Sequence, residues 1–283
     1  MRTFSTAILL TLSIIVQAAQ SEAAGPEKVL MVGDSYIYVY KIPVILEALA
    51  KSSGKKLTVT QHVGGSKSLV WHWTNKSPPD MTTAPEAMAK EHWDMVILEE
   101  GNVDFKKPED IAAFKTCTRD YVDLAAKTKT QVLFYTGIWM QYKLPYLTPE
   151  AIKPGMDMYT QQADALTISC SPVALAFLHC QDRAPLLAVF DCQKDQNKKL
   201  LKYGLDKMGW HQSPFGAYLA ACTLYASIYD QSPVGNKAHS SGDGTTVFDE
   251  VDATIAQQVA WDTWNAYKVT LKATPKAVPA KKK

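Results

Sequence analysis

Apolar runs of strand length alternate with segments of helical periodicity along most of the chain. The strand-like runs are residues 29–32, 57–63, 95–98 and 132–135, with a fifth, shorter run at 168–173. A strand that is covered by helices on both faces has a continuous apolar run, whereas a strand with one wet face has a strict alternation. The pattern therefore predicts a parallel sheet with helices on both faces.

Helical periodicity fills the intervals between these runs and most of the carboxyl-terminal half. The predicted helices cover residues 43–53, 108–127, 148–166, 215–229 and 249–271. Thr148 is the expected cap of the third, with Pro149 in its first position. The last helix should turn one apolar face to the core, formed by Val251, Ile255, Val259, Trp261 and Trp264.

The two ends of the chain differ in composition from the part between them. Residues 1–24 have a positive start at Arg2, an apolar stretch at 7–16 and small residues before position 25, which predicts a secretory signal peptide. Residues 273–283 are mostly Ala, Pro and Lys, which predicts a flexible tail. We thus expect one domain over residues 25–272 in a protein that is exported to the periplasm or the cell exterior.

Composition excludes several classes of partner. The chain has 283 residues, 47% of them hydrophobic, and a net charge of only +2 that owes much to the tail lysines. Nucleic acid and anionic membrane surfaces are therefore not expected partners. No run after the signal reaches the ~20 apolar residues of a membrane helix, so stable membrane insertion is not expected either.

The cysteines and glycines give no support for a cofactor. Neither Cys-x-x-Cys spacing nor a His pair one helical turn apart occurs, so no metal site is predicted, and the Gly64-Gly65 segment lacks the first glycine of a P-loop. The five cysteines permit a disulfide between two of Cys170, Cys180 and Cys192. Cys222 lies in an apolar run and is expected to be buried.

The segment Gly33-Asp34-Ser35 directly follows the first apolar run and is the strongest candidate for chemistry. Gly33 allows a sharp turn after the strand, which would present the Ser35 hydroxyl at the carboxyl edge of the sheet. Ser35 is therefore a candidate nucleophile. The alternative is an ordinary strand-to-helix turn in which Asp34 or Ser35 caps the helix.

Three later turns contain the other groups that a serine nucleophile needs. A serine hydroxyl requires a base that takes its proton and donors that stabilise the oxyanion formed on attack. Gly64 and Gly65 follow the second strand, Asn102 follows the third, and His211 precedes a predicted helix. Each has a structural alternative, a tight turn for the glycines and a packing role for the histidine. Their order along the chain nevertheless favours one site at one sheet edge.

At these positions the chain resembles the SGNH (GDSL-type) hydrolase superfamily, from about Lys28 to Leu271. It is most similar to a subgroup of exported bacterial proteins. The matching segments are Val32-Gly33-Asp34-Ser35-Tyr36, Gly64-Gly65-Ser66-x-Ser68-Leu69-x-x-His72 and His211-x-Ser213-Pro214-x-Gly216-x-Tyr218-Leu219-Ala220-Ala221. The resemblance implies a three-layer α/β/α sandwich with a flavodoxin-like, mostly parallel five-stranded sheet.

The resemblance also implies roles. Ser35 would be the nucleophile and His211 the base. The oxyanion hole would be formed by the N–H groups of Ser35 and of Gly64 or Gly65, with the side chain of Asn102.

Two positions depart from the family pattern. The acidic residue that usually stands three positions before the histidine is Met208 here, and Asp206 is the nearest carboxylate that could replace it. The Gly101-Asn102 segment lacks the spacer of the usual Gly-x-Asn-Asp pattern, which leaves Glu100 as a neighbouring candidate for substrate contacts.

The sequence hypothesis is a serine esterase that forms an acyl-enzyme and removes acyl groups, such as acetyl, from a carbohydrate or another small ester. Asp34, Trp71, His72 and Glu100 are the candidate cleft residues, although the Trp71–Trp73 cluster equally fits a packed surface loop. The alternative hypothesis is a glycan-binding protein on the same fold, with Met208 as the mark of lost catalysis.

Overall fold

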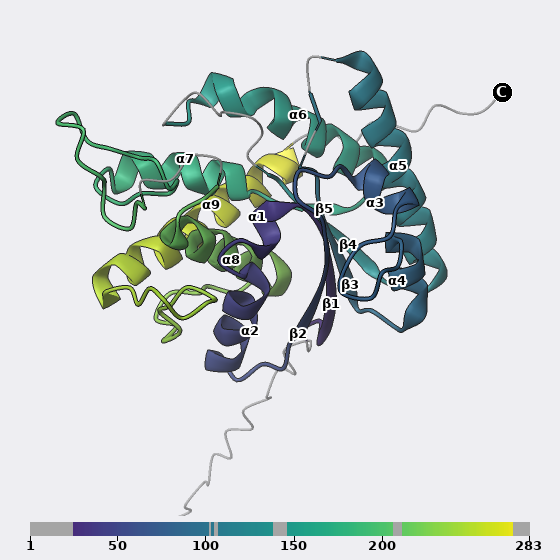
Figure 1. The fold of residues 1–283 in the computed structure, drawn as a ribbon, viewed down its shortest axis with the longest axis horizontal. Helices are drawn as coiled ribbons and strands as arrows, with labels where there is room; N and C mark the ends of the chain where they lie inside the picture. The colour runs from purple at the N-terminus through teal and green to yellow at the C-terminus, as the bar shows by residue number, and fades with distance from the viewer. Residues whose placement is uncertain (1–24, 102, 105–106, 138–145, 206–210, 274–283) are drawn as a thin grey trace, which may run out of the picture.

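Five parallel strands form a sheet in the order β2-β1-β3-β4-β5 (Figure 1). The computed structural model describes residues 25–101, 103–104, 107–137, 146–205 and 211–273. The strands are β1 (Lys28–Gly33), β2 (Thr58–Val63), β3 (Met95–Glu99), β4 (Gln131–Tyr135) and β5 (Ser169–Ser171). This is the flavodoxin-like strand order, so the predicted fold class is confirmed.

Helices cover both faces of the sheet. One layer contains α2 (Ile42–Ser52), α7 (Val173–Arg183), α8 (Pro214–Tyr229) and α9 (Glu250–Ala273), which contact one another. The other layer contains α3 (Leu69–Thr74), α4 (Ala84–Lys90), α5 (Pro108–Lys127) and α6 (Pro149–Leu166). Figure 1 shows α2, α8 and α9 on one side of the sheet and α3, α4 and α5 on the other.

The register brings the carboxyl ends of the strands to one edge. Gly33 lies opposite Val63 on β2, and Glu99 on β3 lies opposite Tyr135 on β4. The turns that follow β1, β2 and β3 therefore meet at this edge, where binding and catalytic groups of open α/β sheets commonly lie.

Local sequence signals explain where several helices begin. Thr148 caps α6 as expected, because its side chain accepts a hydrogen bond from the Ala151 N–H at 3.2 Å and Pro149 follows it. α5 has the predicted bounds. Nearly every residue of α8 is buried, since α2, α7 and α9 all pack against it.

Three expectations about elements need correction. The short helices α3, α4 and α7 were not expected. The run at 168–173 forms a strand only over Ser169–Ser171, because Pro172 ends it and α7 begins at Val173. Val251 is 71% exposed and does not face the core, although Val259 and Trp264 do.

All five cysteines are free thiols, so the disulfide that the sequence permitted is not formed. Cys170 lies on β5, where its thiol contacts the Tyr159 carbonyl at 3.6 Å, and Cys180 lies inside α7. Burial raises the pKa of both thiols to about 12. Cys222 is buried, as expected.

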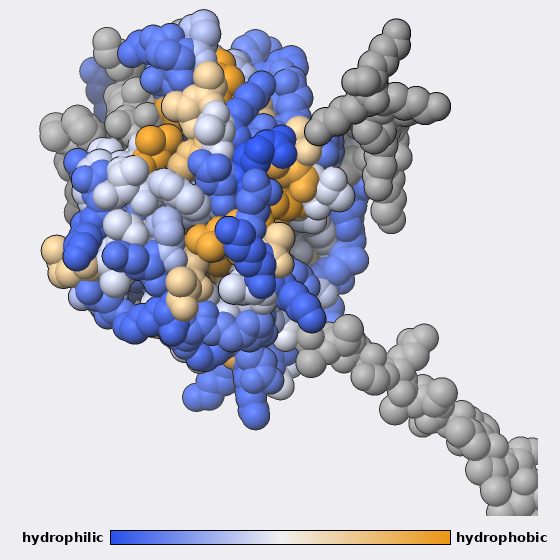
Figure 2. Space-filling view, turned by 90° about the vertical axis from the view of Figure 1, so that its right-hand side faces the viewer, coloured by the Kyte–Doolittle hydropathy of each residue, from blue (hydrophilic) through white to orange (hydrophobic). Residues whose placement is uncertain are grey.

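The outer surface of the helix layer on the right of Figure 1 faces the viewer in Figure 2. Hydrophilic side chains cover most of it, and apolar groups form separate small areas. In the described ranges, no helix is both long and apolar enough to cross a bilayer. The predicted signal peptide and residues 274–283 of the predicted tail lie outside the described residues.

Candidate active site

Ser35 is the first residue of α1 (Ser35–Tyr38), a single turn that directly follows β1. Asp34 caps this turn, because its Oδ1 accepts a hydrogen bond from the Tyr36 N–H at 2.8 Å. Of the two caps that the alternative named, Asp34 is the one that the structure shows. The Ser35 hydroxyl is not needed for that purpose, and its residue is 8% exposed at the carboxyl edge of the sheet.

Gly33 is required for close packing and not for a left-handed turn. Its φ is outside the left-handed region, but a Cβ at this position would lie 2.5 Å from Oε2 of Glu99 and 2.8 Å from Cδ1 of Ile37. Glycine is needed at this position because the Glu99 side chain from β3 packs directly against it, and not because the chain turns sharply there.

Asp34 and Glu99 form a buried carboxyl pair beneath Ser35. Oε2 of Glu99 accepts a hydrogen bond from the Asp34 N–H at 2.8 Å. Glu99 is 1% exposed and Asp34 is 3% exposed. Burial and the neighbouring Asp34 charge raise the pKa of Glu99 well above its ordinary value. Burial also raises the pKa of Asp34. Sequence reasoning did not identify this pair.

Glu100 is fully buried and connects three elements. Its Oε2 accepts a hydrogen bond from the Leu69 N–H at 3.0 Å, and its own N–H donates to the Tyr159 hydroxyl at 2.9 Å. Glu100 therefore ties the end of β3 to α3 and α6.

His72 is also fully buried, against His62 on β2. Their Nδ1 atoms are 3.1 Å apart, and Nε2 of His62 lies 2.8 Å from the Thr82 carbonyl. A carbonyl only accepts, so His62 donates from Nε2 and accepts at Nδ1. Burial and the neighbouring His62 lower the pKa of His72 to about 4. His72 is buried on the side of α3 that faces His62, whereas Trp71, the preceding residue of α3, remains partly exposed.

The two glycines after β2 differ in their hydrogen bonds. The Gly64 N–H donates to the Gly33 carbonyl at 3.2 Å and extends the ladder between β1 and β2. Gly65 follows it and is exposed. Of the two predicted oxyanion donors, Gly65 is therefore the better candidate.

These glycines lie at one end of a groove of about 680 Å³ along the outer edge of β2. It is lined by Tyr38, Lys41, Pro43, Val44, Val59, Gln61, Val63, Gly64, Gly65, Trp71, Ser77 and Pro78. The groove therefore begins beside α1, which carries Ser35.

The segment that contains His211 docks on α1. The ring centroids of His211 and Tyr36 are 6.0 Å apart, and Nε2 of Gln212 donates to the Tyr36 carbonyl at 2.7 Å. The Asp191 N–H donates to the His211 carbonyl at 3.2 Å, and the Tyr40 hydroxyl donates to the buried Asp191 carboxylate. Ser35 and His211 are thus brought to the same region. No pattern in the sequence marked Asp191.

The Ser-Pro-x-Gly part of the histidine motif has a structural role. Ser213 caps α8 by accepting a hydrogen bond from the Gly216 N–H at 2.9 Å, and its hydroxyl donates to the Ala188 carbonyl. A Cβ on Gly216 would lie 2.1 Å from the Val189 carbonyl oxygen. This close packing fixes the start of α8 and, with it, the position of His211.

Two predicted site residues cannot be placed. Asn102 and Asp206 lie outside the described residues, as does Met208. In the part of the chain that the structure describes, no three His, Cys, Asp or Glu side chains gather as a metal site would need.

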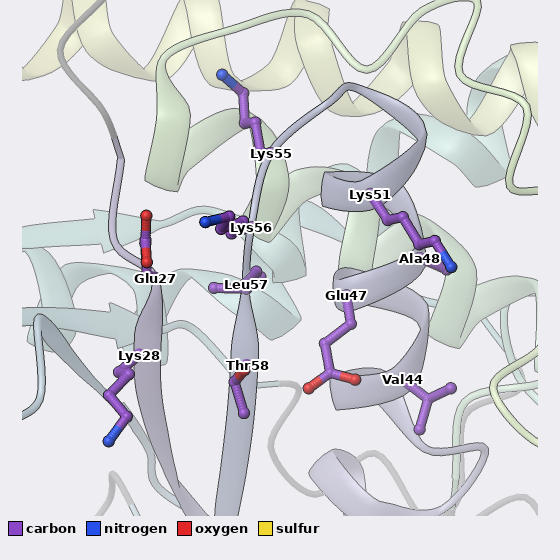
Figure 3. A pocket seen from close by; sticks show the side chains of 10 residues that line it. All are labelled: Glu27, Lys28, Val44, Glu47, Ala48, Lys51, Lys55, Lys56, Leu57 and Thr58. Carbon is purple, nitrogen blue, oxygen red and sulfur yellow. The ribbon is translucent and has the colours of Figure 1, made fainter.

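A second cavity, of about 730 Å³, lies at the opposite end of the sheet (Figure 3). It is lined by Glu27, Lys28, Val44, Glu47, Ala48, Lys51, Lys55, Lys56, Leu57 and Thr58. Figure 3 shows the lysine side chains pointing in different directions instead of toward one point. This cavity therefore lacks the convergent groups of the serine region.

No protein-family model and no curated protein matches the sequence. Solved structures do match. A DUF4886 family protein from Bacteroides uniformis is 18% identical, with a TM-score of 0.57 over 87% of this chain and 96% of that one. An acetyl xylan esterase is 13% identical, with a TM-score of 0.53 over 71% and 99%. A candidate SGNH hydrolase from Slackia heliotrinireducens is 21% identical, with a TM-score of 0.50 over 71% and 97%.

At these identities the likeness concerns the fold. The chain therefore has the α/β fold of the SGNH hydrolases.

Proposed function

We propose that this protein is a serine esterase of SGNH type that works through an acyl-enzyme. The observation that carries the proposal is the docking of the His211 segment on α1, whose first residue is Ser35. The bond from Gln212 to the Tyr36 carbonyl joins the two segments directly. A nucleophile and a base from distant parts of the chain thereby share one edge of the sheet.

In the proposed reaction, Ser35 Oγ attacks the ester carbonyl while the His211 imidazole takes its proton. The imidazolium then protonates the leaving alkoxide, which departs as an alcohol and leaves the acyl group on Ser35. Water, deprotonated by His211, releases the acid and restores the serine. Asp206 is proposed to orient His211.

The oxyanion of each tetrahedral intermediate needs fixed donors. We assign this role to the N–H groups of Ser35 and Gly65 and to the Asn102 side chain. The Gly64 N–H is a weaker candidate because the Gly33 carbonyl already accepts from it. A fixed donor of this kind contributes about 10²–10³ in kcat.

The proposed substrate is an acylated carbohydrate or another small ester. The groove beside Gly65 has Trp71 and Tyr38 on its walls, and aromatic side chains of this kind offer flat apolar faces to sugar rings. We further propose that residues 1–24 direct export and that the mature domain acts in the periplasm or outside the cell.

The test is hydrolysis of p-nitrophenyl acetate by the mature chain, with Ser35→Ala and His211→Asn as the critical variants. We expect both to lose at least about 10³ in kcat, and a fluorophosphonate probe to label Ser35, as located by mass spectrometry. Ser52→Ala and His92→Asn are matched controls on the exposed surface. Full activity in Ser35→Ala, or labelling at another serine, would exclude the proposed mechanism.

The second candidate function is glycan binding without cleavage, favoured by Met208 in place of the usual acid. It predicts no turnover and no label in the wild type, together with glycan binding that Trp71→Ala weakens.

A further inference from the structure

We infer that Glu99 is a positioning residue for the nucleophile: it keeps a proton between its carboxyl group and that of Asp34, and so fixes the turn that carries Ser35. This role is not assigned by the SGNH pattern in the sequence, and it rests on the proposed esterase function.

Hydrogen bonds hold the residues on both sides of Ser35. The Asp34 N–H donates to Glu99, and the Tyr36 N–H donates to the Asp34 carboxylate, each at 2.8 Å. The two carboxyl groups are also close enough for each to shift the pKa of the other. The backbone before and after Ser35 is thus anchored to β3 through Glu99.

The charges around Glu99 require that Asp34 and Glu99 share a proton. The titratable groups that face Glu99 are Asp34 from the end of β1, Glu100 beside it, Tyr135 from β4 and Tyr159 from α6. All of these are acids, and none of these described neighbours supplies a positive charge. Two buried carboxylates in contact cannot both ionise at modest cost, so one keeps its proton. Glu99 is the more buried and keeps it.

Two glycines make room for the pair. A Cβ on Gly33 would lie 2.5 Å from Oε2 of Glu99, and a Cβ on Gly101 would lie 2.3 Å from Cγ of Asp34. A Cβ atom essentially never lies this close to another heavy atom that is not bonded to it. The Gly-Asp-Ser and Glu-Glu-Gly segments are therefore matched to each other across β1 and β3.

The variants Glu99→Gln and Glu99→Leu separate this role from simple packing. The E99Q amide can accept from the Asp34 N–H and donate to the Asp34 carboxylate, as the protonated acid does, whereas the E99L side chain can do neither. We expect kcat to stay within about threefold in E99Q and to fall about 10²-fold in E99L, with KM little changed in both. Glu47→Gln is the matched control, because the Glu47 carboxylate also accepts a hydrogen bond from a backbone N–H, that of Val59, at a partly buried position far from Ser35.

The pH profile supplies a readout that packing alone would not move. When Glu99 ionises at high pH, the shared bond breaks and wild-type kcat should fall. E99Q has no such proton to lose, so its kcat should stay level further into the alkaline range. Equal losses in E99Q and E99L, or full activity in E99L, would overturn the inference.

An infrared measurement tests the shared proton without turnover. The difference spectrum of wild type minus E99Q at neutral pH should contain the carbonyl stretch of a protonated carboxyl group, and the E47Q difference should not. Absence of this band would overturn the inference even in an active enzyme. A band in a protein without esterase activity would instead confirm the proton and count against the proposed function. Because this measurement does not use E99L, it tests the shared proton even if that variant does not fold.

Discussion

Two buried titratable pairs flank the turn that carries Ser35, and they respond to burial in opposite directions. On one side, Asp34 and Glu99 have pKa values above their ordinary ones; on the other, His72, in contact with His62, has a pKa of about 4. The cause is the same in both, because a buried site disfavours whichever form is charged. Burial therefore favours the protonated form of the acids and the neutral form of the imidazole.

The difference between the pairs lies in what they hold. The acid pair accepts hydrogen bonds from the backbone on both sides of Ser35, whereas the histidine pair joins β2 to α3 and to the Thr82 carbonyl. We conclude that the same effect of burial acts on the turn that carries Ser35 on one side and on the wall of the groove on the other. The two sides also predict opposite pH limits, since the acid pair weakens the fold as pH rises and the histidine pair weakens it as pH falls.

The largest expected effect is acid destabilisation through His72. Between pH 6.5 and about 4, the unfolded chain binds a proton at this residue and the folded chain does not, so stability falls as pH falls through this window. A shift of this size corresponds to about 3 kcal/mol. In urea titrations, the stability gap between wild type and His72→Gln should shrink by this amount from pH 7 to pH 4.

His92→Gln, which removes an exposed imidazole, is the control for the loss of a histidine that is not buried. A gap between wild type and His72→Gln that stays constant with pH would contradict the buried neutral imidazole.

A smaller expected effect is a difference in packing between the Asp34–Glu99 pair and the His62–His72 pair. A methyl group on Gly101 would lie 2.3 Å from Asp34 Cγ, but one on Gly64 would lie 3.4 Å from His72 Cε1 and 3.0 Å from the flexible Lys67 side chain. We expect Gly101→Ala to cost about 1–3 kcal/mol in the free energy of unfolding, and Gly64→Ala less than about 1 kcal/mol. Equal costs in urea titrations would show that the acid side has room to adjust.

The sequence was informative where local patterns determine the structure. Continuous apolar runs gave the buried parallel strands, and the Thr148-Pro149 signal gave the start of α6. Because parallel strands end at one edge, the sequence also predicts that the turns after β1, β2 and β3 lie close together. The docking of His211 agrees with that expectation.

Contacts between distant segments were beyond such reasoning. No pattern in the sequence singled out Glu99, and only the register of β1 with β3 places it under Asp34. The burial of His72 depends on how α3, a helix of six residues with little periodicity, packs against β2. Asp191 lies in an irregular segment, where no periodic pattern exists to read.

The smallest expected effect concerns the influence of Lys67 on the pKa of His72. The Lys67 ammonium lies 5.1 Å from the centroid of the Trp71 ring, and its charge is one of the weaker influences that lower the pKa of His72. Lys67→Met should therefore let His72 bind a proton more readily and reduce the acid-induced loss of stability by a few tenths of a kcal/mol. Lys56→Met, an exposed lysine at the other end of β2, should leave the pH profile unchanged. A larger acid-induced loss in Lys67→Met than in wild type would mean that the lysine stabilises the protonated imidazole pair, which reverses the sign of its assigned influence.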